Sequence, residues 1–294
     1  MSTVPIRRNA LIALALLTLV WGYNWIVMKG VLEYAGPFRF IAWRAALATV
    51  VLFAILLLRS ESLRPPPLLP TFVTGLLQIG LFAILIQWAL VEGGAGRTAL
   101  LTYTMPFWLV LLARFVLAER MSRWQWACIC IAAAGLILVI APWQGLGGTH
   151  STVMAIAAGL CWALSVVISK RLFARASVTA LSLTAWQMLF GAIALVIVAA
   201  IVPERAIDWT PRFIAALAYN AVLASGLAWL MWAFIVQRLP ASIAGLTTLA
   251  VPMCGLLFAW ALLGEQPRLV EGIGIALIAL ALFGITRPVS AGPR

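Results

Sequence analysis

Long apolar stretches alternate with short polar ones along the whole chain. A helix needs about 20 mostly apolar residues to cross the hydrocarbon core of a bilayer. The connections between the stretches are short, and most contain proline, glycine or charge, as in Gly93–Gly96. The pattern predicts an all-α integral membrane protein with ten transmembrane helices over Asn9–Lys29, Phe38–Leu58, Leu69–Val91, Thr98–Leu117, Trp124–Ile140, Val153–Lys170, Val178–Val202, Arg212–Gln237, Ala241–Leu263 and Leu269–Ile285.

Composition supports this class. Of 294 residues, 65% are hydrophobic and the mean hydropathy is +1.10, whereas soluble domains are about 45–50% apolar. The net charge of +12 raises the alternative of a nucleic-acid-binding protein. Basic residues that bind nucleic acid cluster on one solvated face, but here they punctuate the apolar stretches. We therefore interpret them as topology signals and expect no nucleic-acid partner.

The distribution of Lys and Arg predicts the orientation. With the N-terminus in the cytoplasm, twelve of the 20 basic residues fall on the cytoplasmic side, six on the opposite side and two within spans. This bias favours both termini inside and an even number of spans. Arg7 and Arg8 before an apolar run resemble a signal peptide, but no small-x-small cleavage site follows. A retained first span is the better interpretation.

An internal repeat divides the chain. Trp21, Asn24 and Lys29 recur as Trp162, Ser165 and Lys170 at an offset of 141, and Trp43-Arg44 recurs as Trp186-Gln187 at 143. A third set recurs at 146: Thr102, Pro106 and Glu119 match Thr248, Pro252 and Glu265. We predict two halves, 1–145 and 146–294, of five helices each. Because five is odd, the halves insert with opposite orientation, as in many transporters.

These residues resemble a known family. The first half carries Trp21-Gly22 with Asn24 and Lys29, then Pro37, Phe40 and Arg44, and the second carries Arg238-Leu239-Pro240-Ala241, Pro252, Leu263-Gly264-Glu265 and Gly272. Over nearly the whole chain the pattern is similar to the drug/metabolite transporter superfamily, in its EamA-type branch of ten-helix carriers. Its aromatic-rich spans look most like the bacterial exporters of aromatic and other amino acids. The resemblance implies a carrier in the bacterial inner membrane with a cavity between its halves.

Catalytic and metal-binding signals are weak. All eight carboxylates lie in connections or at span ends, and the four cysteines form no CxxC or Cys/His cluster. We therefore expect no catalytic site, no cofactor and no metal. Proton-driven carriers commonly use a buried carboxylate, so facilitated diffusion or exchange is at least as well supported as proton coupling.

Pro106 and Pro252 lie near the middle of spans four and nine. Proline removes a helical hydrogen bond and clashes with the carbonyl four residues back, which here belongs to Thr102 and Thr248. We predict two kinked helices that act as hinges. The freed carbonyls could instead line a cavity, and the two interpretations differ in whether replacement changes the substrate preference.

Arg44 lies about 9 Å into its span at 1.5 Å per residue, and it could hold a substrate carboxylate or be satisfied structurally by carbonyls. Lys29 and Lys170 are closer to span ends and suit an interfacial or gating role. Deep tryptophans and mid-span polar groups either line a cavity or pack between helices. The predicted substrate-binding residues are Asn24, Trp43, Arg44, Gln78, Tyr103, Trp162, Ser165, Trp186, Gln187 and Thr248, with Pro106 and Pro252 as hinges.

We thus predict a secondary transporter that exports small metabolites, with amino acids first, by alternating access. Its partners would be membrane lipid and a small-molecule substrate, and it would act as a monomer or homodimer. Alternatives are an exporter or importer of another metabolite or drug in the same fold, an intramembrane enzyme and a channel. Saturable uptake with counterflow would separate a carrier from a channel.

Overall fold

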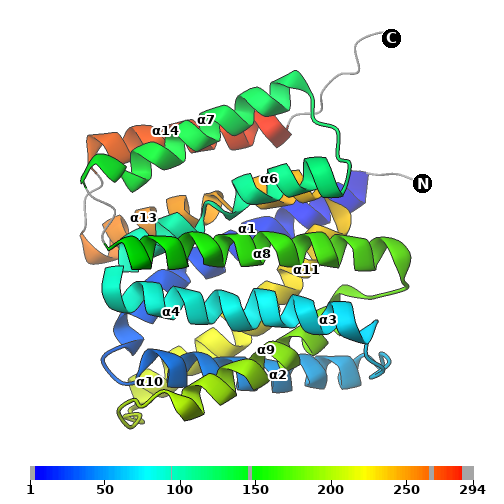
Figure 1. Ribbon diagram of the computed structural model, residues 1–294, viewed down its shortest axis with the longest axis vertical. Coiled ribbons are helices and arrows are strands. Elements are labelled where there is room, and N and C mark those ends of the chain that lie inside the picture. The colour runs from blue at the N-terminus through cyan, green and yellow to red at the C-terminus, as the bar shows by residue number, and fades with distance from the viewer. Residues whose placement is uncertain (1–3, 94, 145–147, 265–267, 287–294) are drawn as a thin grey trace.

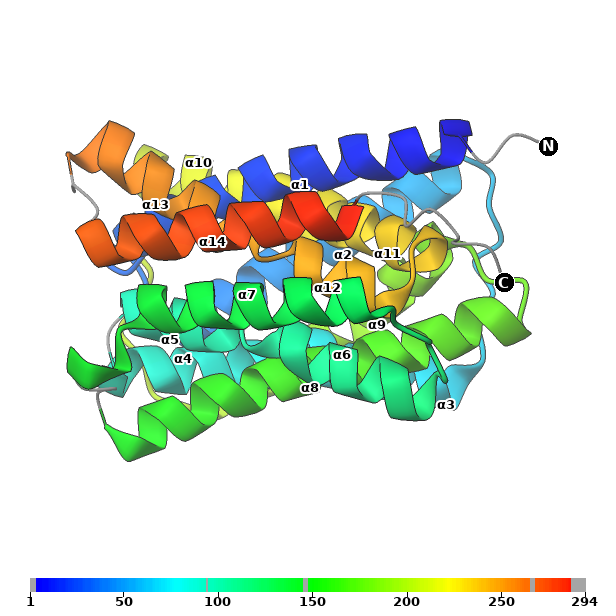
Figure 2. The same ribbon diagram turned by 90° about the horizontal axis from the view of Figure 1, so that it is seen from above.

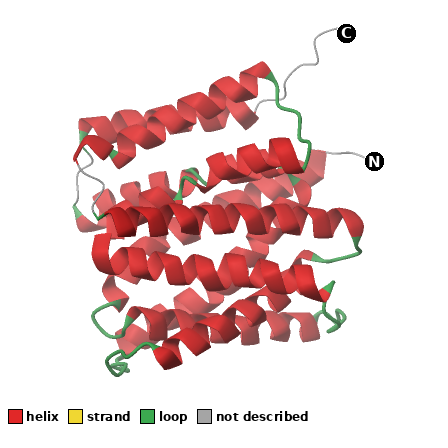
Figure 3. Ribbon diagram, viewed as in Figure 1, coloured by secondary structure: helices red, strands yellow, loops and turns green. Residues whose placement is uncertain are grey.

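The computed structural model describes residues 4–93, 95–144, 148–264 and 268–286. These residues form helices and loops, and no strand occurs among them (Figure 3). The boundary between residues 145 and 146, Glu265 and the C-terminal Arg287 and Arg294 lie outside the described residues, as does the side chain of Lys29.

The first half consists of helices joined by short connections. Between α2 and α7 lie two composite segments, one containing a π-helix and one containing a break. In chain order the elements are α1 (Val4–Val31), α2 (Pro37–Leu58), α3 (Leu68–Gly75), η1 (Leu76–Leu81), α4 (Phe82–Gly93), α5 (Ala95–Thr102), α6 (Met105–Val116) and α7 (Arg123–Ile140).

A short 3-10 turn, η2 (Pro142–Gln144), leads toward the second half, which repeats the same order of elements. It also contains one composite segment with a π-helix and one with a break. Its elements are α8 (Thr149–Arg175), α9 (Ala180–Ile201), α10 (Pro211–Tyr219), η3 (Asn220–Leu227), α11 (Ala228–Arg238), α12 (Ala241–Thr247), α13 (Ala250–Leu263) and α14 (Leu269–Thr286).

In the described part of the chain, eight helices are long and apolar enough to cross a membrane. Two shorter apolar helices, Leu100–Val116 and Leu269–Ile285, occupy the places of the fourth and tenth predicted spans. The protein is therefore a multi-pass membrane protein. Several helices extend beyond their predicted bounds: the first spans Val4–Val31 and the sixth Thr149–Arg175.

Residues with known preferences for helix ends mark where several helices begin and end. Pro37, Pro106 and Pro211 lie in the first turns of α2, α6 and α10, where the missing N–H costs little. Ser122 and Gln125 form a reciprocal capping box at the start of α7. Gly264 ends α13 with a positive φ of 71°, a conformation that glycine adopts without steric cost.

The predicted kinks at the two prolines are complete helix breaks. Helix α5 ends at Thr102 and α6 begins at Met105, while α12 ends at Thr247 and α13 begins at Ala250. Each proline lies in the first turn of the second helix, where it no longer clashes with a helical carbonyl. The hydroxyls of Thr102 and Thr248 donate to backbone carbonyls of their own helices.

Contacts between helices follow the repeat. Each of three segments packs on its counterpart in the other half: α2 on α9, α6 on α12 and α7 on α14. The pair α4–α8 corresponds to α1–α11, and the pair α6–α8 to α1–α13. In Figure 1, α7 and α14 form one edge of the bundle and α2 and α9 the other.

Helix α1 begins and helix α14 ends at the same end of the bundle (Figures 1 and 2). We call this the terminal end, where α1 begins and α8 finishes, and we call the other the distal end, where α2 begins. The first predicted half thus starts and the second finishes on the same side of the molecule.

Candidate functional site

An aromatic cluster occupies the middle of the bundle. The indoles of Trp21 and Trp162 meet edge to face with ring centroids 5.6 Å apart, and Trp229 lies 5.0 Å from Trp21 and 5.6 Å from Trp162. Phe82 and Trp232 extend the cluster. Trp21 and Trp162 are the paired tryptophans of the sequence repeat, so the two halves touch through equivalent residues.

A π-helix in the second half holds Trp21 in this cluster by a hydrogen bond. The indole Nε1 of Trp21 donates to the carbonyl of Ala224 at 3.0 Å, and Ala224 lies in the π-helix η3. A second π-helix, η1, lies at the corresponding place in the first half. π-turns are rare and are frequent at functional sites, and this one presents a backbone acceptor to a side chain of the other half.

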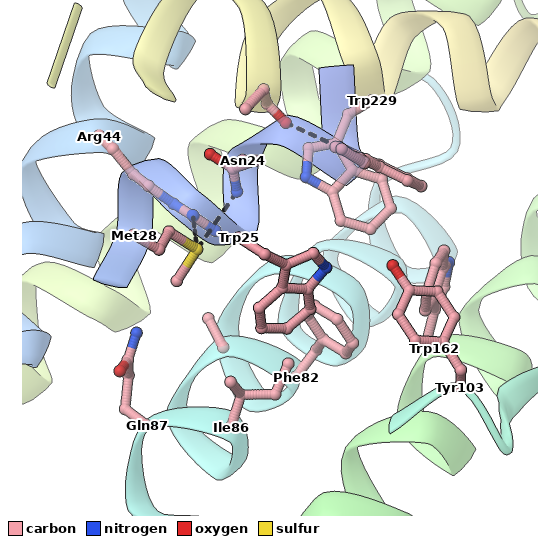
Figure 4. A pocket seen from close by; sticks show the side chains of 13 residues that line it. Asn24, Trp25, Met28, Arg44, Phe82, Ile86, Gln87, Tyr103, Trp162 and Trp229 are labelled. Carbon is pink, nitrogen blue, oxygen red and sulfur yellow. Dashed lines mark hydrogen bonds between the residues drawn. The ribbon is translucent and has the colours of Figure 1, made fainter. Parts of the chain in front are cut away.

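A pocket lies against the aromatic cluster on its distal side (Figure 4). Asn24 and Met28 belong to the last two turns of α1, and Arg44 lies two turns into α2, about 10 Å from where that helix begins. The lining residues are Trp21, Asn24, Trp25, Met28, Arg44, Phe82, Ala83, Ile86, Gln87, Tyr103, Trp162, Ala224 and Trp229.

Arg44 carries the only formal charge among these thirteen described lining residues. Its Nη1 is 3.7 Å from the sulfur of Met28 and 3.4 Å from Oδ1 of Asn220. Both contacts are long, and a thioether is a weak acceptor. The guanidinium is therefore held at membrane depth, and neither acceptor in these two contacts carries a negative charge. A charge without a countercharge is costly there.

Three polar atoms of the lining have no hydrogen-bond partner in this structure. They are Oδ1 of Asn24, Oε1 of Gln87 and Nε1 of Trp162. Asn24 is 9% exposed and Gln87 2% exposed. Leaving a buried polar atom unsatisfied costs about 1–3 kcal/mol, and such atoms in a pocket are available to a bound molecule.

The pocket is narrow in this conformation. Its cavity volume is about 80 Å³, compared with about 300–1,000 Å³ for typical sites of drug-sized ligands. It has room for a few water molecules. A metabolite can enter only after neighbouring helices or side chains move apart.

Four of the predicted binding residues meet in this pocket: Asn24, Arg44, Tyr103 and Trp162. The hydroxyl of Tyr103 points toward the Trp25 indole (Figure 4). Tyr103 lies in the break between α5 and α6. The break just before Pro106 therefore brings a polar side chain to the pocket, although Pro106 itself does not line it.

Five predicted residues lie elsewhere in the interior. Their side chains pack between helices or bond to their own backbone: Ser165 donates to the carbonyl of Trp162, Thr248 donates to that of Gly245, and Trp186 packs against Phe53. Gln78 and Gln187 are buried at 2% and 1% exposure outside the pocket lining. The structure does not bring these five to the pocket.

Trp43 faces away from the pocket. It is 45% exposed and packs edge to face on Trp209 at 5.6 Å, on the outside of the bundle. Neighbouring positions on a helix are separated by about 100°, so the turn that directs Arg44 inward directs Trp43 outward. Its expected place in a cavity lining is not supported by this structure.

Several lining residues were not among the predicted site residues. Trp21 heads the repeated motif, and its pairing with Trp162 was a usable signal. Gln87 and Trp229 belong to the mid-span polar and deep aromatic sets, whose members the sequence could not separate into lining and packing. Met28 and Phe82 are ordinary apolar residues with no distinguishing signal.

Carboxylates join the two halves at both ends. At the terminal end, Glu119 accepts from the backbone N–H of Ala241 at 2.6 Å and of Ser242 at 3.1 Å, and from the Ser242 hydroxyl at 2.7 Å. These groups belong to the start of α12, where unpaired N–H groups attract negative charge. Glu119 therefore holds the start of the ninth segment to the end of the fourth.

Glu204 does the same at the distal end. It accepts from the backbone N–H of Phe38 at 2.9 Å and of Arg39 at 2.7 Å, at the start of α2. Its counterpart at an offset of 143, Glu61, accepts from the hydroxyl of Thr179 at 2.8 Å, at the start of α9. The carboxylate that follows each of the second and seventh segments thus bonds to the start of the other segment.

Lys170 also reaches across helices at the terminal end. Its Nζ donates to the carbonyls of Val236 at 3.0 Å and Leu239 at 2.8 Å, where α11 ends. The contacts satisfy orphan carbonyls of that helix end. They place Lys170 away from the pocket, at the position that suits an interfacial or gating residue.

Comparison with known proteins fixes the family. A family model described as the EamA-like transporter family matches residues 8–141 and 151–287. The chain belongs to this family. Members of this family move small molecules across membranes, which places the chain among membrane transporters.

Curated relatives of this EamA-like transporter match over almost its full length. The uncharacterized transporter YoaV of Bacillus subtilis is 26% identical over 275 residues, which cover 90% of this chain and 92% of the relative. A probable amino-acid metabolite efflux pump of Salmonella typhimurium is 27% identical over 289 residues, 94% of each chain. A protein of the same description from Escherichia coli is 26% identical over 291 residues, also 94% of each.

A protein of known crystal structure shares the fold. It superposes with a TM-score of 0.81 at 20% sequence identity, covering 95% of this chain and 96% of the other. At this identity the likeness concerns the fold alone.

Proposed function

We propose that this transporter exports amino acids, aromatic and other neutral ones, by alternating access through the pocket beneath Arg44. The observation that carries the proposal is an aromatic pocket at the junction of the two halves with a single buried cation. Such a pocket suits an apolar or aromatic side chain attached to a carboxylate. Two relatives described as amino-acid metabolite efflux pumps support the same cargo.

We further propose that the halves are inverted repeats related by a pseudo-twofold axis in the membrane plane. The separate family matches to residues 8–141 and 151–287 support two units. The paired packing of counterpart helices supports a twofold relation, because equivalent elements meet only near such an axis. The reciprocal bonds of Glu61 to the start of α9 and of Glu204 to the start of α2, at opposite ends of the bundle, support inversion.

In this account the membrane is the bacterial inner membrane and the terminal end faces the cytoplasm. The pocket lies between the aromatic cluster and the distal end. The bonds of Glu119 and Lys170 hold helix ends together on the terminal side. Rocking of the halves would break the bonds of Glu119, which join the two halves, open the terminal side and carry the cargo past Trp21 and Trp162.

For the coupling we propose facilitated diffusion or exchange. The thirteen described lining residues include no carboxylate that could relay a proton, and buried carboxylates are the usual relays in proton-driven carriers. The alternative is transport of a different small metabolite, in either direction, through the same pocket.

The test is a screen with the purified full-length protein in liposomes. Uptake of labelled amino acids, nucleobases and polyamines would be measured with and without a pH gradient, with empty liposomes as the control. We expect saturable uptake of phenylalanine and other neutral amino acids, unchanged by the gradient. Uptake of nucleobases or polyamines without amino acids would refute the proposed cargo, and a gradient-dependent rate would refute the proposed coupling.

A further inference from the structure

The sulfur of Met28 occupies a position that two donors share. Asn24 Nδ2 lies 3.2 Å from this sulfur, and Arg44 Nη1 lies 3.7 Å from it (Figure 4). A thioether is a poor acceptor for both. A carboxylate oxygen would accept far more strongly from an amide N–H and a guanidinium. The donors therefore converge on a place that an anion would fill better than the sulfur does.

Methionine is suited to give up this place. Its side chain is unbranched with three rotatable bonds and adapts to irregular space. Met28 begins the last turn of α1, where the pocket approaches the distal end. Rotation of its side chain away from Arg44 would enlarge a cavity of about 80 Å³ at the point where the new ligand oxygen is needed.

The acceptors of the pocket are neutral. Oδ1 of Asn24 and Oε1 of Gln87 are buried without a partner, and the terminal amide torsion of glutamine is soft enough to turn toward a ligand. Both amide oxygens can accept from an ammonium, and either one can accept the single proton of a hydroxyl. Glu204, which shares a surface groove with Gln87, is already bonded to the start of α2.

We infer that the pocket recognises its cargo as an aromatic carboxylate whose α-substituent is read only as a hydrogen-bond donor. The carboxylate replaces the Met28 sulfur between Asn24 Nδ2 and Arg44, and the α-substituent donates to the amide oxygen of Asn24, of Gln87, or, for an ammonium, of both. The aromatic group packs among Trp25, Phe82 and their neighbours. The inference rests on the proposed function, because it takes the same pocket as the transport site. It adds aromatic 2-hydroxy acids to amino acids as substrates.

Electrostatics favours this wider class. A zwitterion brings its own positive charge next to Arg44, whereas a hydroxy acid is a net anion that neutralises the guanidinium. In a low-dielectric site this difference is large, and none of the thirteen described lining residues is a carboxylate that offsets it in favour of the ammonium.

The experiment compares ligands on the unmodified protein. Labelled L-phenylalanine uptake into liposomes would be competed with unlabelled phenylalanine, phenyllactate and phenylalaninamide, and the thermal stability of the purified protein would be measured with each compound. We expect phenyllactate to compete at least as strongly as phenylalanine, and phenylalaninamide to be at least tenfold weaker than phenylalanine. Equal competition by the amide, or none by phenyllactate, would overturn the inference while phenylalanine uptake upheld the proposed function.

Variants then test the named groups. Arg44→Gln should weaken the binding of phenylalanine and phenyllactate about ten- to hundredfold, as expected for loss of hydrogen bonds to a charged group. In this variant phenylalaninamide should compete as well as phenylalanine does. Arg39→Gln is the matched control, because it removes a charge from the same helix outside the pocket lining and should retain the preference for carboxylates. Stabilisation by phenyllactate without phenylalanine transport would refute the proposed function and uphold the inference.

Discussion

Glu119 offers the clearest test of how the terminal end is held closed. Its carboxylate accepts three hydrogen bonds, from the N–H groups of Ala241 and Ser242 and from the Ser242 hydroxyl. Glu119→Gln keeps the size of the side chain but removes the charge. Bonds to a charged acceptor contribute about 1.5–3 kcal/mol each and neutral ones about 0.5–1.5. Because Glu119 is only partly buried, we expect a net loss of about 2 kcal/mol.

That loss acts on the closed state only if opening breaks these bonds. A change of about 2 kcal/mol then raises the open population about 30-fold. Ser169 provides the readout, since it is the repeat counterpart of Met28 at an offset of 141. It is buried at 6% exposure, but in the inverted conformation it would take the place that Met28 now has at the pocket.

The assay is the labelling rate of Ser169→Cys by a charged thiol reagent, in a background without the four native cysteines. We expect Glu119→Gln to raise this rate about 30-fold. Glu204→Gln is the matched control, because it weakens the distal end and should not raise the rate. An unchanged rate in Glu119→Gln, or an equal rise in both variants, would refute the link between this carboxylate and the opening of the terminal end.

The remaining predictions concern packing, the hinges and the aromatic cluster. A Cβ on Gly274 would lie 2.6 Å from a carbonyl on α7, whereas one on Gly272 would meet nothing within 4 Å. In thermal unfolding, Gly274→Ala should lower the free energy of unfolding by about 1–3 kcal/mol, and Gly272→Ala should leave it unchanged. Equal stabilities of the two variants would contradict the close helix contact. Pro106→Ala and Pro252→Ala should lower the transport rate but leave the rank order of substrates unchanged if the breaks are hinges, and a changed rank order would make them part of the site. Trp21→Phe keeps the ring packing but leaves the carbonyl in η3 without its donor, so unfolding should be easier by about 1–2 kcal/mol, and unchanged stability would show that this bond contributes nothing.

Much of the architecture was predictable from the sequence because the bilayer imposes it. Span length, the positions of prolines and the repeat of Trp21 at Trp162 follow from hydropathy and spacing, and the described helices agree with them. The π-helices were not predictable, since η1 and η3 differ from ordinary helix only in hydrogen-bond pattern. Their turns shift every side chain that follows by part of a turn.

The pocket was predictable only in part. Arg44 and Asn24 stand out because polar groups are costly at membrane depth, and they lie together in the structure. Trp43 and Gln187 also carry polar groups at membrane depth, yet Trp43 faces outward and Gln187 packs between helices. Helices that are apolar all round carry no stripe that tells an inner face from a lipid face, so the orientation of such residues depends on packing.

Counterflow in liposomes tests the central claim most directly. Proteoliposomes loaded with unlabelled phenylalanine would be diluted into a trace of labelled phenylalanine, and the internal label would be followed over time. A carrier with one alternately exposed pocket predicts a transient accumulation of label above its equilibrium level, which disappears without the internal load. Monotonic equilibration at a rate that does not saturate with concentration would contradict alternating access and indicate a channel.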